Sequence, residues 1–177
     1  MSLPISTISP PGSPPSPAMS MESIHDFQFD TAMQLARRKI KVMIVDDNSI
    51  NLSILSRMLK VHFSETVELV AVMTSGLDAL DRLNQEQIDL ILMDIDMPVL
   101  TGVETTVAIR QITSEYPILK ENQKVPIIAV TTSDHAVQRE MYQRVGMCDC
   151  VSKPISLSKL RLAIENAITL MGHIAPG

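Results

Sequence analysis

Aspartate residues follow two apolar stretches of this chain, and carboxylates in such places can bind a metal ion or act as nucleophiles. Asp94 comes directly after Leu90-Ile91-Leu92-Met93, a run typical of a strand that is buried on both faces of a sheet. Asp46 and Asp47 follow the apolar run 42–45. In open α/β sheets ligands bind at the carboxyl ends of the strands, where these carboxylates would lie. For Asp94 alone an acidic turn is an equally good interpretation, because Asp and Pro are common turn residues.

Two other polar residues follow expected strands later in the chain. Thr131 comes after the run 127–130, and Lys153, followed by Pro154, comes shortly after the run 148–151. If all these strand ends meet, the carboxylates repel one another and need a cation among them, for which Mg²⁺ is well suited. A carboxylate nucleophile, a divalent ion, a hydroxyl and a lysine are the groups needed to form an aspartyl phosphate.

The segments that would position these residues alternate between strand and helix patterns. We expect strands at 41–45, 67–73, 89–93, 127–130 and 148–151, and helices at 48–61, 76–83, 103–116, 135–145 and 157–171. Five strands, each followed by a helix, indicate an α/β fold with helices on both faces of a parallel sheet. The flavodoxin-like, doubly wound strand order 2-1-3-4-5 is the common solution, and its switch point brings Asp46 and Asp47 next to Asp94.

The composition favours one folded domain, which we expect at residues 39–172. Of the 177 residues, 45% are hydrophobic and 20% are charged, as in an ordinary globular protein. The net charge of −5 and the 3% content of aromatic residues argue against direct nucleic-acid binding. No apolar run approaches the roughly 20 residues that cross a bilayer, and no signal peptide is evident, so we expect no membrane contact and a cytoplasmic location.

Both ends of the chain are expected to lie outside this domain. Residues 1–38 begin with a Ser/Pro-rich stretch that is expected to be disordered, with a weak helical pattern at 23–39; residues 173–177 should form a disordered tail. The basic run 37–41 can be a nuclear address, although a solvated flank before a strand is the simpler interpretation. Cys148 and Cys150 are too close along a strand to bridge each other and are expected to be reduced.

The quoted motifs together resemble those of a response-regulator receiver domain, a module of two-component and phosphorelay signalling. The resemblance extends over roughly residues 40–171 and includes Asp46-Asp47, the run Asp94-Ile95-Asp96-Met97-Pro98, Thr131 and Lys153-Pro154. The Ser/Pro-rich start and the long connection 116–124 are similar to those of eukaryotic, especially fungal, phosphorelay proteins.

The resemblance implies a role for each residue of the site. Asp94 would accept a phosphoryl group from a phosphohistidine, with Thr131 as the switching hydroxyl and Lys153 as the partner of the phosphoryl group. The Lys153-Pro154 bond would be cis, as is usual in the family. Mg²⁺ would be bound by four groups: the carboxylates of Asp46, Asp47 and Asp94 and the backbone carbonyl of Asp96.

The family resemblance also implies partners. The upstream partner would be a histidine-containing phosphotransfer protein or a histidine kinase, and signalling would proceed by binding an unknown downstream protein rather than by enzymatic turnover. The helix expected at 48–61 carries two apolar stripes. One stripe suffices to face the sheet. The second stripe consists of Ile50, Ile54, Met58 and Val61. This second stripe would be either a docking strip for the phosphotransfer partner or part of a broad buried face.

Three positions depart from the family pattern. Cys150 stands where an aromatic residue usually precedes the lysine by three positions, so a switch based on rotation of that aromatic is not expected. Thr132 follows the switching threonine where a small alanine is usual. Asp96 places an acid two residues after the acceptor, where the family adjusts the lifetime of the phosphorylated state.

Two other functions remain open from the sequence. Asp94-Ile95-Asp96 fits the Asp-x-Asp core of haloacid-dehalogenase-like phosphatases, although in those enzymes that motif lies on the first core strand and the acidic pair comes late. A pseudo-receiver would keep the fold and bind a partner without being phosphorylated. Turnover of small phosphate esters would identify the first alternative, and failure to be phosphorylated would identify the second.

Overall fold

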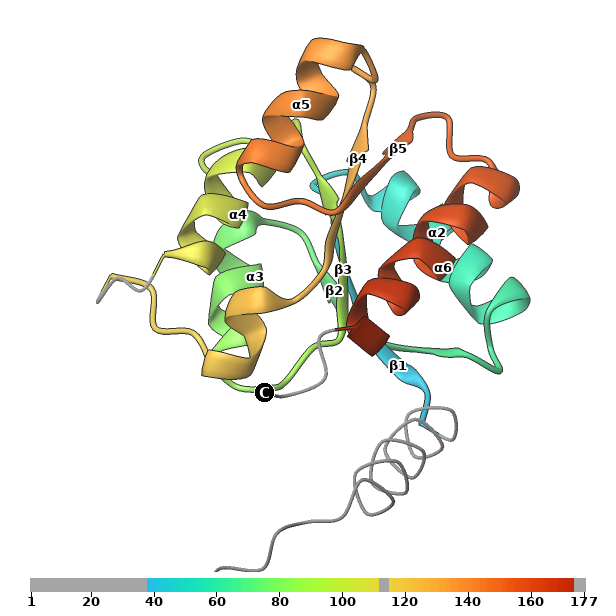
Figure 1. Ribbon diagram of the computed structural model, residues 1–177, viewed down its shortest axis with the longest axis horizontal. Coiled ribbons are helices and arrows are strands. Elements are labelled where there is room, and N and C mark those ends of the chain that lie inside the picture. The colour runs from blue at the N-terminus through green and yellow to red at the C-terminus, as the bar shows by residue number, and fades with distance from the viewer. Residues whose placement is uncertain (1–37, 112–114, 174–177) are drawn as a thin grey trace, which may run out of the picture. The chain divides into compact units, whose positions relative to one another are not determined.

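The centre of the protein is a five-stranded parallel sheet (Figure 1). In the computed structural model, residues 38–111 and 115–173 are described. The strands lie in the order β2-β1-β3-β4-β5, which confirms the predicted fold class. Their bounds are β1 (Ile40–Val45), β2 (Val67–Met73), β3 (Leu90–Asp94), β4 (Ile127–Thr131) and β5 (Asp149–Ser152).

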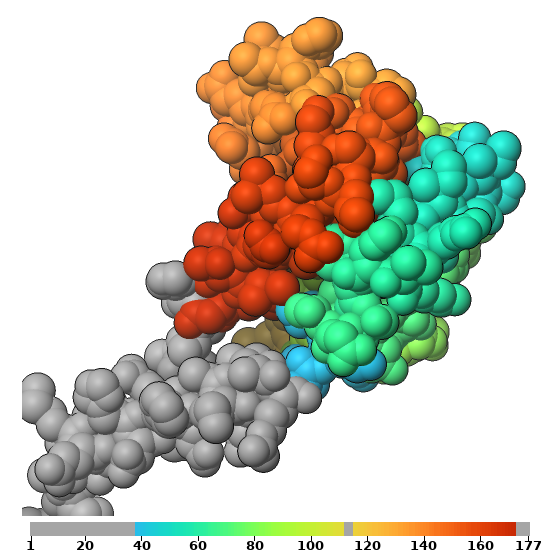
Figure 2. All heavy atoms as spheres, turned by 90° about the vertical axis from the view of Figure 1, so that its right-hand side faces the viewer, coloured from blue at the N-terminus to red at the C-terminus, as the bar shows by residue number. Residues whose placement is uncertain are grey.

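Helices cover both faces of this sheet. Figure 1 shows α2 and α6 on one face and α3, α4 and α5 on the other, and Figure 2 views the first of these faces, where α2 and α6 lie side by side. The described helices are α2 (Ser49–His62), α3 (Gly76–Leu83), α4 (Gly102–Arg110), α5 (Ala136–Arg144), α6 (Leu157–His173) and the short 3₁₀ helix η1 (Lys120–Lys124).

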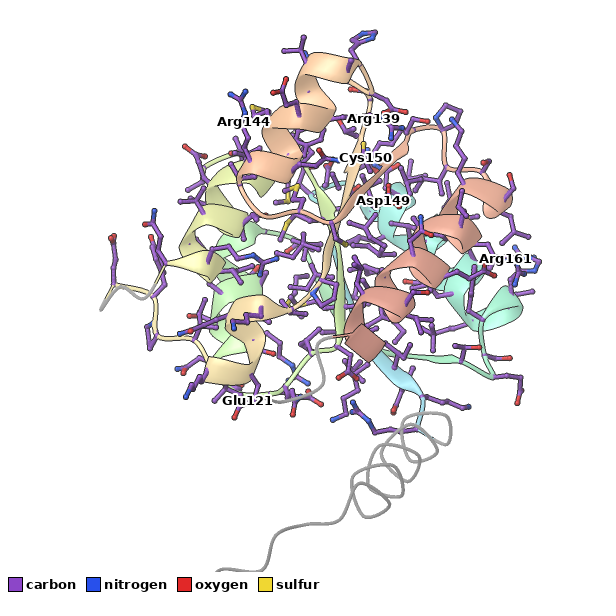
Figure 3. The ribbon with its side chains drawn as sticks, in the orientation of Figure 1. Glu121, Arg139, Arg144, Asp149, Cys150 and Arg161 are labelled. Atoms are coloured by element: carbon purple, nitrogen blue, oxygen red, sulfur yellow. The ribbon has the colours of Figure 1, made fainter. Side chains whose placement is uncertain are left out.

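Side chains fill the space between the sheet and the helices on both sides (Figure 3). The buried apolar ones form two clusters, one on each side of the sheet, which make up the core. All five residues of β3 and all five of β4 are buried, which explains why their sequences are continuous apolar runs rather than alternating ones. From α2, Leu52, Leu55 and Leu59 pack against the sheet, and from α3 Ala79, Leu80 and Leu83 pack on the opposite side. Because β3 is buried on both faces, its last residue, Asp94, is held in a fixed position at the carboxyl-terminal end of the sheet.

Side-chain caps fix where the helices near that edge begin. The Asn48 side chain accepts a hydrogen bond from the Ile50 amide at 2.9 Å, so α2 begins immediately after the acidic pair. At α4, Thr101 and Glu104 form a capping box in which each side chain accepts a hydrogen bond from the other residue's backbone amide. The predicted bounds of most elements agree with the structure within a few residues.

The helix predicted at 103–116 is wrong at its C-terminal end, because α4 ends at Arg110. Gln111 already has an extended backbone, with φ −89° and ψ 133°. The guanidinium of Arg110 donates hydrogen bonds to the carbonyls of Gln123, Val125 and Gly146 at 2.8–3.0 Å, so the end of α4 is tied to the segments beside it. The connection that follows contains η1, which the sequence patterns did not predict.

The predictions for the two ends of the chain fall largely on residues 1–37 and 174–177, which lie outside the described residues. Among the described helices, none combines the length and the apolar character needed to cross a membrane.

Candidate functional site

Three aspartates meet where β1 and β3 end. The two strands are parallel neighbours, with Val45 opposite Met93, so the residues that follow them come together. Carboxylate oxygens of Asp46, Asp47 and Asp94 all lie within 4.8 Å of one another. Asp46 and Asp94 are buried, and Asp47 is exposed. The sequence prediction that topology brings these carboxylates together therefore agrees with the geometry.

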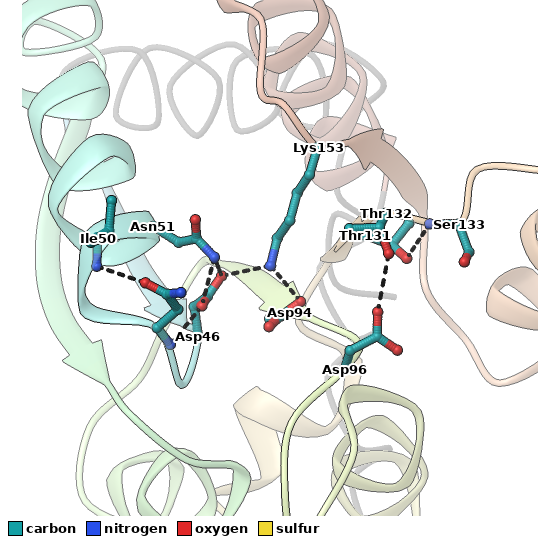
Figure 4. Close-up of polar contacts among 10 residues, drawn as sticks. Asp46, Ile50, Asn51, Asp94, Asp96, Thr131, Thr132, Ser133 and Lys153 are labelled. Atoms are coloured by element: carbon teal, nitrogen blue, oxygen red, sulfur yellow. Dashed lines mark hydrogen bonds and ion pairs between the residues drawn. The ribbon is translucent and has the colours of Figure 1, made fainter.

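Lys153 joins this cluster from the far strand β5 (Figure 4). Its Nζ atom donates hydrogen bonds to Asp46 Oδ2 at 2.9 Å and to Asp94 Oδ1 at 2.8 Å. The Lys153-Pro154 bond is cis, as the family resemblance implies, and the Lys153 amide donates to the Thr131 carbonyl at 2.7 Å. One ammonium group thus stands between two buried carboxylates and partly neutralises them.

Asp46 is also held by the start of α2. The Asn48 amide donates to Asp46 Oδ1 at 2.9 Å, and the Asn51 side-chain amide lies 3.1 Å from both carboxylate oxygens. Sequence analysis identified neither Asn48 nor Asn51 as part of the site, although Asn51 could have been recognised. The available signal was its position, since the first turn of a helix that starts beside an acidic pair must lie over that pair. Both asparagines orient Asp46 rather than add charge.

Burial and lysine act in opposite directions on the acceptor. Burial raises the pKa of Asp94 above its usual value, and the negative charge of Asp46 raises it further, while the hydrogen bond from Lys153 lowers it. For Lys153, burial alone lowers the pKa, but its hydrogen bonds to Asp94 and Asp46 outweigh burial, and the net pKa is raised. The lysine therefore stays protonated and supports the ionised form of Asp94.

Thr131 and Asp96 lie on the other side of Asp94 from Asp46, following the order of the strands (Figure 4). Thr131 is fully buried, and its hydroxyl accepts a hydrogen bond from the Ser133 amide at 3.0 Å. Asp96 is exposed, and the Thr132 hydroxyl donates to its Oδ2 atom at 3.4 Å. The two departures Thr132 and Asp96 therefore interact with each other at the mouth of the site.

Tyr142 is a residue that sequence analysis missed. It projects from α5, is 2% exposed, and its hydroxyl lies 3.3 Å from the Thr131 hydroxyl. Cys150, by contrast, directs its thiol toward Asp134 Oδ1 at 3.7 Å, on the side of Arg139 (Figure 3). Burial raises the Cys150 pKa to about 11, so the thiol is protonated at neutral pH, and both cysteines are free, as predicted.

The turn between Asp94 and α4 depends on Gly102. Its amide donates to the Ile95 carbonyl at 3.0 Å, which closes the loop tightly. A Cβ atom at this position would lie 2.1 Å from the Asp94 carbonyl oxygen, closer than any side chain tolerates. Glycine is therefore required here for the loop carrying Asp96 to fold back against the acceptor.

The donor set of the site fits a hard divalent cation. The three clustered carboxylates offer only oxygen atoms, which Mg²⁺ prefers, and the exposed Asp47 leaves one side open to water and substrate. Asp46, Asp47 and Asp94 are the residues that would hold the ion, and the carbonyl of Asp96 remains a predicted fourth ligand.

Comparisons with known proteins show which family has this fold and sequence. Residues 42–165 match the family model of the response regulator receiver domain. The structure is similar to that of the receiver domain of the sensor histidine kinase PA1611 from Pseudomonas aeruginosa, which has a magnesium ion coordinated in its active-site cleft, with a TM-score of 0.61, 27% identity and coverage of 75% of this chain and 99% of that one. It is also similar to the chemotaxis protein CheY4 of Vibrio cholerae, with a TM-score of 0.61, 25% identity and coverage of 73% and 99%.

Sequence relatives include much longer proteins. The chain is 38% identical over 119 residues to the signal transduction histidine-protein kinase BarA of Escherichia coli, which covers 67% of this chain but only 12% of BarA. It is 30% identical over 146 residues to Histidine kinase 5 of Arabidopsis thaliana, covering 72% of this chain and 15% of that kinase. With its fold, its acidic cluster and these matches, the chain belongs to the response-regulator receiver domain family of two-component and phosphorelay signal transduction.

Proposed function

We propose that this receiver domain accepts a phosphoryl group from a phosphohistidine onto Asp94 in a Mg²⁺-dependent reaction. The observation that carries the proposal is the convergence of two further carboxylates and Lys153 on one buried, strand-end aspartate. A cluster of this kind is electrostatically costly in a resting protein, because burial already raises the pKa of Asp94. Such a cost is typical of functional sites, where binding of a substrate offsets it.

Each residue would contribute one part of the transfer. A carboxylate oxygen of Asp94 would attack phosphorus while the bond from phosphorus to the histidine nitrogen breaks and its electron pair returns to the imidazole. Lys153, already 2.8 Å from Asp94, would follow the added negative charge of the phosphoryl group, and the Thr131 hydroxyl would donate to one of its oxygens. Bound Mg²⁺ would supply positive charge to the phosphoryl oxygens.

Labelling with acetyl phosphate or phosphoramidate in the presence of Mg²⁺ tests this assignment. The wild-type protein should gain one acid-stable, base-labile phosphoryl group, and Asp94→Asn should gain none while keeping its folded circular-dichroism spectrum. Asp81→Asn, which removes an exposed carboxylate from α3, is the matched control and should be labelled like the wild type. Labelling of Asp94→Asn would refute the assignment, and steady turnover of small phosphate esters would indicate a phosphatase instead.

The phosphoryl donor would dock on α2. The second apolar stripe of α2 is largely solvent-exposed, with Ile50 67%, Ile54 47% and Val61 61% exposed. Ile54 and Val61, together with Arg57, Met58 and His62, line a shallow hollow on this helix. Because α2 starts directly after Asp46 and Asp47, a partner seated on this stripe would bring its own residues close to the acceptor. An apolar patch with basic neighbours suits a helical histidine-phosphotransfer protein or kinase domain.

A charge placed in this stripe separates docking from chemistry. Ile54→Asp should slow phosphoryl transfer from a purified histidine-phosphotransfer protein and leave labelling by acetyl phosphate unchanged. Val137→Asp places the same charge at an exposed apolar position of α5, on the opposite face of the sheet, and should affect neither rate. Equal transfer rates for Ile54→Asp and the wild type would place the docking surface elsewhere.

A further inference from the structure

Tyr142 links helix α5 to the end of strand β4 through a ring of hydrogen bonds. Its hydroxyl lies 3.3 Å from the Thr131 hydroxyl and donates to the Ser133 carbonyl, also at 3.3 Å. The Ser133 amide in turn donates to the Thr131 hydroxyl at 3.0 Å. Thr131 is fully buried and Tyr142 is 2% exposed, so water has little access to either hydroxyl.

Counting protons assigns the donors in this ring. A carbonyl oxygen only accepts, so the single proton of the Tyr142 hydroxyl goes to Ser133. The Thr131 hydroxyl then satisfies both groups by donating its own single proton to the Tyr142 oxygen. In the unphosphorylated protein the Thr131 proton is therefore committed to a residue of α5.

Phosphorylation of Asp94 would compete for that same proton. Asp94 lies opposite Val130 in the parallel pair of β3 and β4, so Thr131 is the next residue of β4 toward the ligand-binding edge. A phosphoryl oxygen is a charged acceptor and forms stronger hydrogen bonds than a phenol oxygen does. Once Thr131 turns its proton to the phosphoryl group, the buried oxygen of Tyr142 loses its donor.

We propose that Tyr142 is a positioning residue that holds the Thr131 hydroxyl toward α5 in the unphosphorylated state and releases it on phosphorylation, so that α5 responds to the state of Asp94. This inference rests on the proposed function. Cys150, at the position where the family usually has an aromatic residue, takes no part, because its thiol contacts Asp134. The contact to Thr131 comes instead from an aromatic residue on the neighbouring helix.

The first test removes only the phenol hydroxyl. Tyr142→Phe no longer competes for the Thr131 proton, so its affinity for beryllofluoride with Mg²⁺, a stable mimic of the phosphoryl group, should rise about 2- to 10-fold, the range of one neutral hydrogen bond. The same substitution in a Thr131→Val background should change the affinity by less than twofold, because the competing proton is already gone. Tyr116→Phe, at the other tyrosine of the chain, is the control and should bind like the wild type.

The second test follows Tyr142 directly. The chain has two tyrosines and no tryptophan, so in Tyr116→Phe the side chain of Tyr142 is the sole tyrosine fluorophore. Its emission should change when beryllofluoride and Mg²⁺ bind, and the amide resonances of α5 should shift in Tyr116→Phe more than in Tyr142→Phe.

Three results would overturn the inference. Unchanged beryllofluoride affinity in Tyr142→Phe, an equal gain in the Thr131→Val background, or an unchanged Tyr142 emission would each show that the two hydroxyls are not coupled to the acceptor. Failure of the wild type both to bind beryllofluoride and to be labelled by acetyl phosphate would instead refute the proposed function itself. The two failures are therefore distinguishable.

Discussion

Replacing Lys153 with methionine should destabilise the metal-free protein strongly. Lys153 is the cation that contacts both buried carboxylates, at 2.9 Å from Asp46 and 2.8 Å from Asp94, and those side chains are only 1% and 3% exposed. Methionine keeps a similar unbranched shape but removes the charge, so the two carboxylates would repel each other with no protein cation between them.

The size of the effect follows from burial. Removing one partner of a buried ion pair costs about 3–5 kcal/mol. The Lys153 side chain keeps 17% exposure, so solvent reaches the site and the lower end of that range, about 3 kcal/mol, applies. For a domain of this size such a loss corresponds to a fall in Tm of roughly 10 °C.

Mg²⁺ should return part of this stability, because the ion and the lysine neutralise the same carboxylates. Without the competing lysine the variant should bind Mg²⁺ more tightly than the wild type, and each tenfold gain in affinity returns about 1.4 kcal/mol at saturation. The difference between variant and wild type should therefore shrink when EDTA is replaced by saturating Mg²⁺, by about 1.4 kcal/mol if the affinity gain is tenfold.

Urea unfolding of both proteins in EDTA and in Mg²⁺ measures these quantities. Lys159→Met is the matched control, because Lys159 is an exposed lysine whose Nζ atom donates to the Ser152 hydroxyl rather than to a buried carboxylate, and its loss should change stability by less than about 0.5 kcal/mol. A loss below about 1 kcal/mol for Lys153→Met in EDTA, the size of a surface ion pair, would refute the reasoning. So would a loss of equal size with and without Mg²⁺.

Two further predictions concern Asp96 and pH. The exposed carboxylate of Asp96 can act as a base for the water that hydrolyses the aspartyl phosphate, and such assistance is worth up to about 10²–10⁴-fold in rate. Asp96→Asn and Asp96→Met should therefore both slow the decay of the phosphorylated protein at saturating Mg²⁺. Equal or faster decay in both variants would contradict this role. Burial holds the pKa of Asp94 above its usual 3.8, so the native state binds a proton on Asp94 more tightly than the unfolded state does. Protonation of Asp94 therefore stabilises the native state at low pH, and this stabilisation is lost as pH rises from about 4. In EDTA, the free energy of unfolding of Asp94→Asn should lack that fall, and parallel pH curves for the two proteins would show that Asp94 is not coupled to folding.

The fold and most of the site were predictable, because the fold follows from the pattern of strands and helices and the site residues follow the ends of those strands. Continuous apolar runs mark strands buried on both faces, and the alternation of strands and helices restricts the topology to a few choices. Once the order β2-β1-β3-β4-β5 is fixed, the residue that follows each strand lies at a known place along one edge. Asp46, Asp94 and Lys153 therefore come together without any knowledge of side-chain packing.

The end of α4 and the 3₁₀ helix were not predictable in this way. The apolar periodicity of residues 103–116 is that of a helix, and only the hydrogen bonds of Arg110 to the carbonyls of Gln123, Val125 and Gly146 show what the end of α4 is tied to. Asn122, in η1, is fully buried, and its side-chain amide is satisfied by donating to the carbonyls of Leu83 and Glu86. Contacts such as these join residues 13 to 39 positions apart, and they leave no local pattern in the sequence.

Tyr142 lies between these two cases. A residue on a helix reaches a strand end only if the helix has the right rotation and the side chain has the right length, and neither property is set by strand order. The sequence does show that position 150 has no aromatic residue, and a buried threonine hydroxyl at a strand end needs a hydrogen-bond partner from some neighbouring element. Because α5 follows β4 and precedes β5, its inward face is the nearest source, and Tyr142 is the aromatic residue of α5. A motif position that lacks its usual aromatic residue, as position 150 does, can therefore direct attention to the helix that packs beside the strand carrying it.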